Sequence, residues 1–79
     1  MSRVLLFGRL ADLAGWRERR IEASSLDALR SAIAAEDAGL GAALSGPGVQ
    51  AAVDQALVRG DAALSPASEV AFLPPMSGG

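Results

Sequence analysis

Residues 69–79 read Glu69-Val70-Ala71-Phe72-Leu73-Pro74-Pro75-Met76-Ser77-Gly78-Gly79. The first part of this segment is almost entirely apolar and includes a β-branched and an aromatic residue, which predicts a β-strand at 69–73. Proline has no N–H to donate and fixes φ, so the strand must end before Pro74. The sequence therefore predicts a folded domain at 1–73 and an extended C-terminal tail at 74–79.

The opening segment, residues 3–8, has the same apolar character as the predicted last strand. Side chains alternate along a strand, so Val4 and Leu6 fall on one face and Leu5 and Phe7 on the other. Two apolar faces are typical of a central strand that is covered on both sides. We therefore expect the first and last strands to lie side by side in the centre of a sheet.

The segments between these two strands predict one main helix and several short elements. This helix is expected to begin near Ser24 or Ser25, since Ser24 stands three residues before Asp27, close to the spacing of a capping box. Leu26, Leu29 and Ile33 form an apolar stripe at helical spacing. The other expected elements are a helical turn at 10–15, a strand at 17–23, a helical turn near 40–44, and strands at 49–54 and 57–58. The charged residues 17–20 are interpreted as a solvated edge, with a binding patch as the alternative. One main helix on a small mixed sheet is the β-grasp arrangement, an α+β fold.

The composition excludes several functions. The chain has 79 residues, which fit one domain, and it contains no His, Cys, Tyr or Lys, so most acid–base and covalent catalysis lacks its usual side chains. A zinc site without His or Cys is not expected, and we predict no bound cofactor or metal. The formal net charge of −2 argues against a nucleic-acid partner, because such proteins usually present a basic face.

The N-terminal apolar run is too short for the core of a signal peptide, and charged residues follow it at once. No segment approaches the roughly 20 apolar residues that span a bilayer. We therefore expect a cytoplasmic protein without a membrane partner.

The tail offers one reactive group, the carboxyl of Gly79. Gly78 and Gly79 have no side chains, so they can enter a channel too narrow for other residues. A C-terminal carboxylate is a poor electrophile, but adenylation makes it an acyl donor and conversion to a thiocarboxylate makes it a sulfur nucleophile. The tail can reach about 20 Å from the domain. The alternative is that this segment is an ordinary chain end with no function.

Three segments resemble the sulfur-carrier (small) subunit of molybdopterin synthase: residues 70–79, residues 4–15, and residues 51–58, where that family more often has Asn in place of Asp54. The resemblance covers essentially the whole chain, and the tail is its most specific part. It implies a ubiquitin-like β-grasp fold and a carrier subunit that is not an enzyme by itself.

The same resemblance implies that an E1-like enzyme uses ATP to adenylate Gly79 and that a sulfur donor protein then yields the thiocarboxylate. The tail would enter the large catalytic subunit and deliver sulfur to cyclic pyranopterin monophosphate in molybdenum cofactor biosynthesis, within a heterotetramer. By family analogy the partner-binding residues are Phe7, Leu57, Leu73, Pro74, Pro75, Met76 and Ser77. The alternative for Phe7, Leu57 and Leu73 is that they belong to the core.

Two other functions remain open from the sequence. A related carrier supplies sulfur to thiazole synthesis and has the same fold and Gly-Gly end, although the segment from Phe7 to Gly15 favours the molybdopterin branch. A ubiquitin-like modifier or an interaction domain would have the same fold without carrying sulfur.

Overall fold

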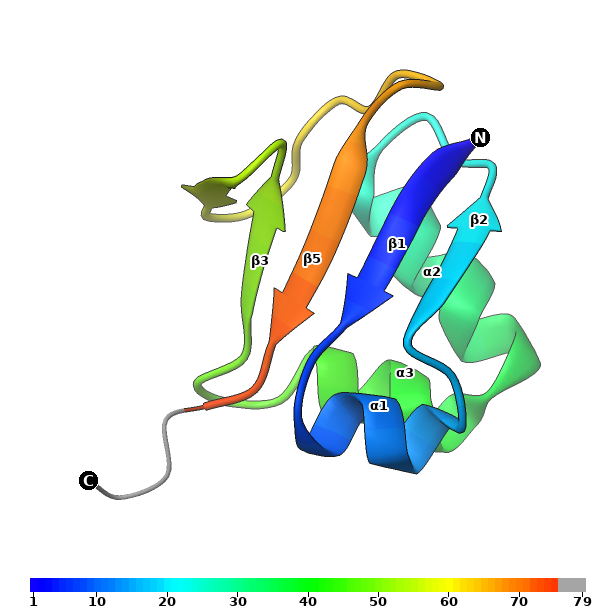
Figure 1. Ribbon diagram of the computed structural model, residues 1–79, viewed down its shortest axis with the longest axis vertical. Coiled ribbons are helices and arrows are strands. Elements are labelled where there is room, and N and C mark those ends of the chain that lie inside the picture. The colour runs from blue at the N-terminus through cyan, green and yellow to red at the C-terminus, as the bar shows by residue number, and fades with distance from the viewer. Residues whose placement is uncertain (76–79) are drawn as a thin grey trace.

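The computed structural model describes residues 1–75, and Met76, Ser77, Gly78 and Gly79 lie outside the described residues. Five strands form one mixed sheet with the order β2-β1-β5-β3-β4 (Figure 1). The strands are β1 Ser2–Leu6, β2 Glu18–Ile21, β3 Gln50–Val53, β4 Ala56–Val58 and β5 Glu69–Leu73. The helices are α1 Arg9–Ala14, α2 Leu26–Glu36 and α3 Ala38–Leu44. The predicted α+β class and mixed sheet are confirmed.

The first and last strands are neighbours, as predicted. β1 and β5 pair in parallel, with Val4 opposite Val70 and Leu6 opposite Phe72. β5 also pairs with β3, so it has a partner strand on both sides. The parallel pairing brings the C-terminal ends of β1 and β5 to the same end of the sheet (Figure 1). There the chain leaves β1 toward α1, and Pro74 follows β5.

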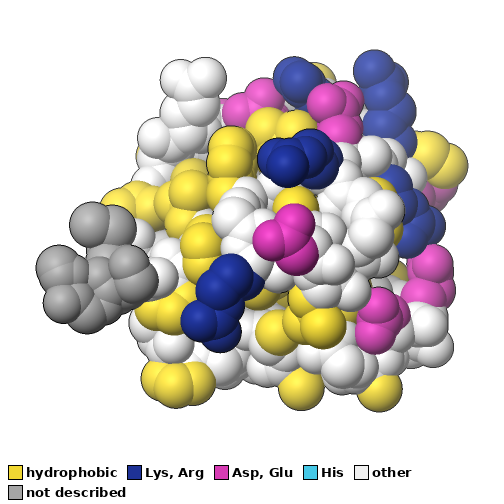
Figure 2. All heavy atoms as spheres, turned by 60° about the horizontal axis from the view of Figure 1, so that its bottom comes forward, with side chains coloured by type: hydrophobic (Ala, Val, Ile, Leu, Met, Phe, Trp, Pro, Cys, Tyr) yellow, Lys and Arg dark blue, Asp and Glu magenta, His cyan; other side chains and the backbone are white. Residues whose placement is uncertain are grey.

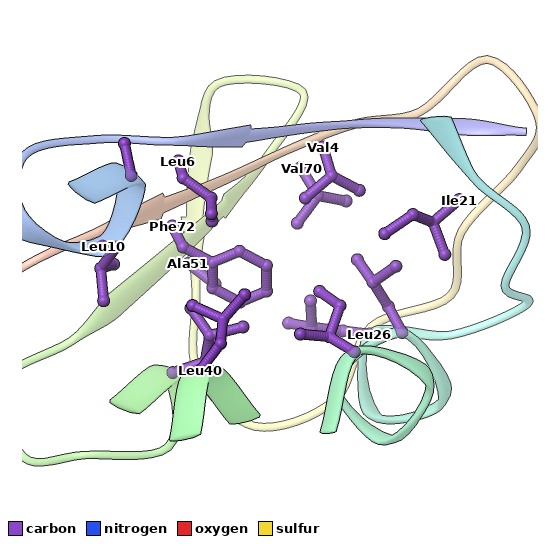
Figure 3. Close-up of a cluster of buried hydrophobic side chains, with 13 residues drawn as sticks. Val4, Leu6, Leu10, Ile21, Leu26, Leu40, Ala51, Val70 and Phe72 are labelled. Atoms are coloured by element: carbon purple, nitrogen blue, oxygen red, sulfur yellow. The ribbon is translucent and has the colours of Figure 1, made fainter. Parts of the chain in front are cut away.

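The core lies between one face of the sheet and the helices (Figure 3). Phe72 is fully buried and projects from β5 toward Leu26 of α2 and Leu40 of α3, which are also buried. Full burial of each large apolar side chain contributes about 1.5–3 kcal/mol. The other large buried side chains of this layer are Val4, Leu6, Leu10, Ile21, Leu29, Ile33, Leu44 and Val70. The predicted helical stripe is confirmed.

Of the two predicted starting points of α2, the structure has Ser25 as the N-cap. Its Oγ accepts a hydrogen bond of 3.1 Å from the N–H of Ala28. The residue at the third helical position is therefore Ala28, and Asp27 cannot close a capping box. Instead, the N–H of Asp27 donates to Asp61, which lies in the loop after β4. A tertiary contact replaces the local one that the sequence favoured.

Helix α3 is a longer element than the predicted helical turn. Asp37 caps it, accepting a hydrogen bond from the N–H of Leu40 at 3.0 Å. Gly41 is buried against α2, and a Cβ placed on it would lie 2.4 Å from the Cβ of Ala34. The two helices therefore pack closely because Gly41 has no side chain.

The edge strand β2 is charged and exposed, as predicted for a solvated edge. At the other edge, β3 and β4 form a hairpin whose turn residues, Asp54 and Gln55, both have positive φ. Within residues 1–75, no helix has the length and apolar character needed to cross a membrane.

Candidate functional site

Two glycines contact the first two residues of the C-terminal tail, Pro74 and Pro75, which we call the tail root. Gly8 has a φ of 56°, and a Cβ placed on it would lie 3.0 Å from Cγ of Pro74. Gly48 has a φ of 81°, and a Cβ there would lie 2.7 Å from Cβ of Pro75. Both positions combine a left-handed backbone with close approach of a proline, so both favour glycine. The direction in which the chain leaves β5 is therefore fixed by the loops after β1 and before β3.

A groove of about 520 Å³ runs beside the tail root. It lies between α1, α3 and the segment before β3, and its lining includes Leu10, Leu13, Pro47, Val49, Pro74 and Pro75. Arg9 is the one charged residue in the lining. Pro74 and Pro75 thus line an apolar groove that has a guanidinium in its lining.

The face of the sheet opposite the helices is apolar across four strands. Side chains that stand opposite each other in the register form a row on this face, namely Leu5, Ala71, Ala52 and Leu57. Leu57 is 61% exposed. Leu73, two residues after Ala71 on the same face, is half-buried. We call these five residues the open face.

Phe7 follows β1 directly, and its N–H donates to the carbonyl oxygen of Phe72. It is 45% exposed. Phe7 and Leu57 therefore lie outside the core, which contradicts the core alternative for these two residues. Figure 2 shows that apolar side chains cover much of this end of the molecule, with charged side chains set singly among them.

Arg3 of β1 links charged groups on the two neighbouring strands, β2 and β5. Arg3 Nε lies 2.9 Å from Glu18 Oε2, and Arg3 Nη1 lies 3.2 Å from Glu69 Oε2. The hydrogen bond from Arg3 lowers the pKa of Glu18 below its ordinary value. Glu69 begins β5 and Leu73 ends it, so the same side of the sheet changes from charged to apolar toward the tail.

Comparison with known proteins identifies the family. The sequence pattern of the ThiS family matches residues 4–79, almost the whole chain. This chain belongs to the ThiS family. It is also 37% identical over 81 aligned residues to the molybdopterin synthase sulfur carrier subunit of Escherichia coli (strain K12), with 100% of both chains covered.

Two solved structures share the fold of this ThiS-family chain. The crystal structure of SAMP1 from Haloferax volcanii has a TM-score of 0.85 at 22% identity and covers 99% of this chain and 98% of its own. The solution structure of the small archaeal modifier protein 1 from Methanosarcina acetivorans has a TM-score of 0.86 at 18% identity, with 99% and 95% covered. The ubiquitin-like β-grasp fold is confirmed.

The structure places the predicted site residues of this ThiS-family chain in two groups. Pro74 and Pro75 form the tail root, while Leu57 and Leu73 lie on the open face and Phe7 follows the strand beside it. Gly78 and Gly79, together with Met76 and Ser77, fall outside the described residues. In the part of the chain that is described, no group of three or more His, Cys, Asp or Glu residues gathers where a metal ion could bind.

Sequence reasoning missed the two glycines that hold the tail root. Gly8 ends the apolar segment 3–8, and Gly48 precedes the strand expected at 49–54. Neither position shows a role in the sequence, because Pro74 and Pro75 lie far from both along the chain. One signal in the sequence could have indicated this contact. A Pro-Pro pair follows the predicted last strand, and a glycine lies directly after or shortly before each of the strands that neighbour it.

Proposed function

We propose that this chain is a sulfur carrier for molybdopterin synthesis, not catalytic by itself, and that the carboxyl of Gly79 carries the sulfur as a thiocarboxylate. The observation on which the proposal depends is the fixed exit of the tail. Gly8 and Gly48 hold Pro74 and Pro75 at the end of β5, beside the open face. A partner that covers the open face would therefore receive the tail in a defined direction. The match to the sulfur carrier subunit of Escherichia coli supports the same function.

The proposed chemistry takes place on partner proteins. An E1-like enzyme binds ATP, and the carboxylate of Gly79 attacks the α-phosphate, so that pyrophosphate leaves and an acyl adenylate forms. Sulfide supplied by a sulfur donor protein then attacks the acyl carbon, so that the C–S bond forms, the bond from carbon to the phosphate oxygen breaks and AMP leaves. The product is the thiocarboxylate. The chain needs no cofactor of its own for either step. With no Cys, His or Lys in the sequence, the terminal carboxyl is the strongest candidate for the reactive group.

The proposed acceptor complex forms on the open face. The large catalytic subunit would cover Leu57 and Leu73 together with Phe7, and the tail from Pro74 to Ser77 would extend into its active site. Large exposed apolar side chains that lie close together are typical of protein interfaces. In a heterotetramer each large subunit would bind one carrier, and the sulfur would pass to cyclic pyranopterin monophosphate.

The experiment uses the chain, its E1-like enzyme, ATP and a sulfur source, with the intact mass of the chain as the readout. The chain should gain the mass difference between sulfur and oxygen and should then support molybdopterin formation with the large subunit. Deleting Gly79 moves the carboxyl by about 3.5 Å and should abolish both results, because misplacement by 1 Å can cost about a hundredfold in rate. Normal thiocarboxylation and molybdopterin formation by the deletion variant would overturn the proposal.

Two readouts separate the alternatives: the molybdopterin assay with the large subunit, and the mass of protein from the native host. A carrier for thiazole synthesis would also be thiocarboxylated, but it would fail to support molybdopterin formation. A modifier would be found with Gly79 in amide linkage to lysines of other proteins.

A further inference from the structure

We infer that Arg9 at the tail root is arginine because a lysine there would capture the activated C-terminus. This inference rests on the proposed function and identifies a residue that protects its reactive intermediate. All seven cationic side chains of the sequence are arginines. Arg9 is the one that lines the groove beside Pro74 and Pro75. The sequence therefore has no lysine, and the structure places one of its arginines, Arg9, beside the start of the tail.

The activated end can reach the position of Arg9. Gly8, the neighbouring residue, lies against Pro74, since a Cβ on it would be 3.0 Å from the proline Cγ. From Pro75 to Gly79 the chain has four further residues, which span at most about 14 Å. This length is sufficient to reach the groove margin beside Pro75. Groups tethered by a short linker have effective concentrations in the millimolar range.

The two cationic side chains differ in what they do at that concentration. The amine of lysine has an ordinary pKa of about 10.4, so a fraction of it is neutral and nucleophilic near neutral pH. A neutral amine attacks the carbonyl carbon of the acyl adenylate, so the C–N bond forms, the bond from carbon to the phosphate oxygen breaks and AMP leaves. The proton of the amine passes to solvent, and the tail is lost as a cyclic amide. The guanidinium of arginine stays protonated and does not react in this way.

Arg20 provides a matched control within the same chain. It lies on β2 opposite Arg3, and Arg3 stands opposite Glu69 at the start of β5. Arg20 is thus at the far end of the sheet from Pro74 and two strands away from β5. Among the described residues, neither Arg9 nor Arg20 makes an ion pair, so a lysine should preserve the fold at both positions.

The test needs no activating enzyme. The chain, the Arg9→Lys variant and the Arg20→Lys variant are each released from an intein fusion as a C-terminal thioester of a small thiol. An amine that attacks this thioester forms the C–N bond, breaks the C–S bond and releases the thiol, and the product is lighter than the hydrolysed acid by one water. Intact mass measures the cyclised fraction, and fragmentation locates the amide.

We expect Arg9→Lys to give a cyclised fraction at least about tenfold higher than Arg20→Lys, because a nearby tethered amine has a far higher effective concentration than a distant one. The fraction should not change with protein concentration, and it should rise with pH as the amine loses its proton. Equal cyclised fractions in the two variants would overturn the inference. Since this test omits ATP and the E1-like enzyme, such a result would leave the proposed thiocarboxylation to be decided by its own experiment.

Discussion

A Cβ placed on Gly48 would lie 2.7 Å from the Cβ of Pro75, a separation that side chains in folded proteins do not tolerate. Gly48 belongs to the loop before β3, and Pro75 follows β5, so the two lie 27 positions apart in the sequence. The contact holds the tail root against the body of the domain. Leu73, one of the residues of the open face, ends β5 beside this contact.

The first prediction concerns this contact and uses Gly60 as its control. Both glycines have positive φ, 81° for Gly48 and 75° for Gly60, but nothing lies within 4 Å of a Cβ on Gly60. Each Gly→Ala variant should lose about 1–2 kcal/mol of unfolding free energy from the left-handed backbone. Only Gly48→Ala should also push Pro75 out of place. It should therefore slow sulfur transfer even under conditions in which both variants are fully folded. Urea unfolding and the thiocarboxylation assay measure the two effects.

Equal transfer rates in Gly48→Ala and Gly60→Ala would show that the position of Pro75 does not matter for function. In that case the tail root would be a structural detail, and the direction of exit would not support the proposed carrier role.

The second prediction separates two glycines of α3. Gly39 has only ordinary contact around a built Cβ, at 3.5 Å from Asp37, whereas a Cβ on Gly41 would lie 2.4 Å from that of Ala34. Gly39→Ala should stabilise the domain by about 0.5–1 kcal/mol, because alanine favours the helix. Gly41→Ala should destabilise it by about 1–3 kcal/mol through overpacking against α2. Chemical denaturation of both variants should give opposite signs; stabilisation by both would mean that α3 does not pack on α2 as described.

The third prediction concerns the open face. Leu57 and Leu13 are similarly exposed, at 61% and 54%, but Leu13 lies on α1 and lines the groove. Leu57→Gln should leave the melting temperature almost unchanged and weaken binding of the large subunit by about tenfold or more, the scale of an interface residue that contributes over 1 kcal/mol. Leu13→Gln should leave that binding unchanged. Calorimetric titration decides between the two, and a larger loss for Leu13→Gln would move the proposed interface to the groove.

The fourth prediction follows from the pKa of Glu18. The hydrogen bond from Arg3 lowers this pKa below its ordinary value of 4.5, so the ionised form is favoured in the folded state. The stabilisation is therefore present above the ordinary value and is lost as the pH falls through the lowered pKa. Glu18→Gln should reduce stability slightly at neutral pH and not at all at the acid end of the curve. Because Arg3 and Glu18 are both exposed, the stability difference between the two proteins should shrink in high salt. A stability difference that persists unchanged to low pH would contradict the ion pair as its cause.

Much of the fold could be predicted because its signals are local. The strand at 69–73 matches β5 at both ends, since an apolar alternation stops at a proline. The start of α2 could be predicted only as Ser24 or Ser25, because both serines can act as the N-cap. In the folded chain the N–H of Asp27, which a Ser24 cap would bind, donates to Asp61 instead. Such a contact joins residues far apart in the sequence, and a single sequence does not reveal it.

Only part of the candidate site could be predicted, because some of its residues come together only in the folded chain. Phe7, Leu57 and Leu73 could be proposed as partner-binding residues from family resemblance, while their exposure depends on which face of the sheet the helices cover. Gly8 and Gly48 could not be assigned to the tail root, because their role depends on the positions of Pro74 and Pro75 in the folded chain.

The last prediction concerns the hairpin that presents Leu57. Asp54 and Gln55 form its turn with φ values of 50° and 70°, the geometry of a type I′ turn, which favours Asn or Asp followed by Gly. Asp54 suits the turn and also accepts a hydrogen bond of 2.9 Å from the N–H of Glu69. Gln55 has no such compensation among the described residues, so its left-handed backbone should cost about 1 kcal/mol.

Gln55→Gly should therefore raise the unfolding free energy by about 0.5–1 kcal/mol, after the greater entropy of glycine in the unfolded chain is subtracted. Gln55→Val should lower it, because a β-branched side chain disfavours positive φ. Urea unfolding of the two variants measures both changes. Since the backbone of Leu57 keeps its register with Ala52 in both cases, binding of the large subunit should not change. A stable Gln55→Gly variant that no longer binds would show that the side chain of Gln55 is itself part of the interface.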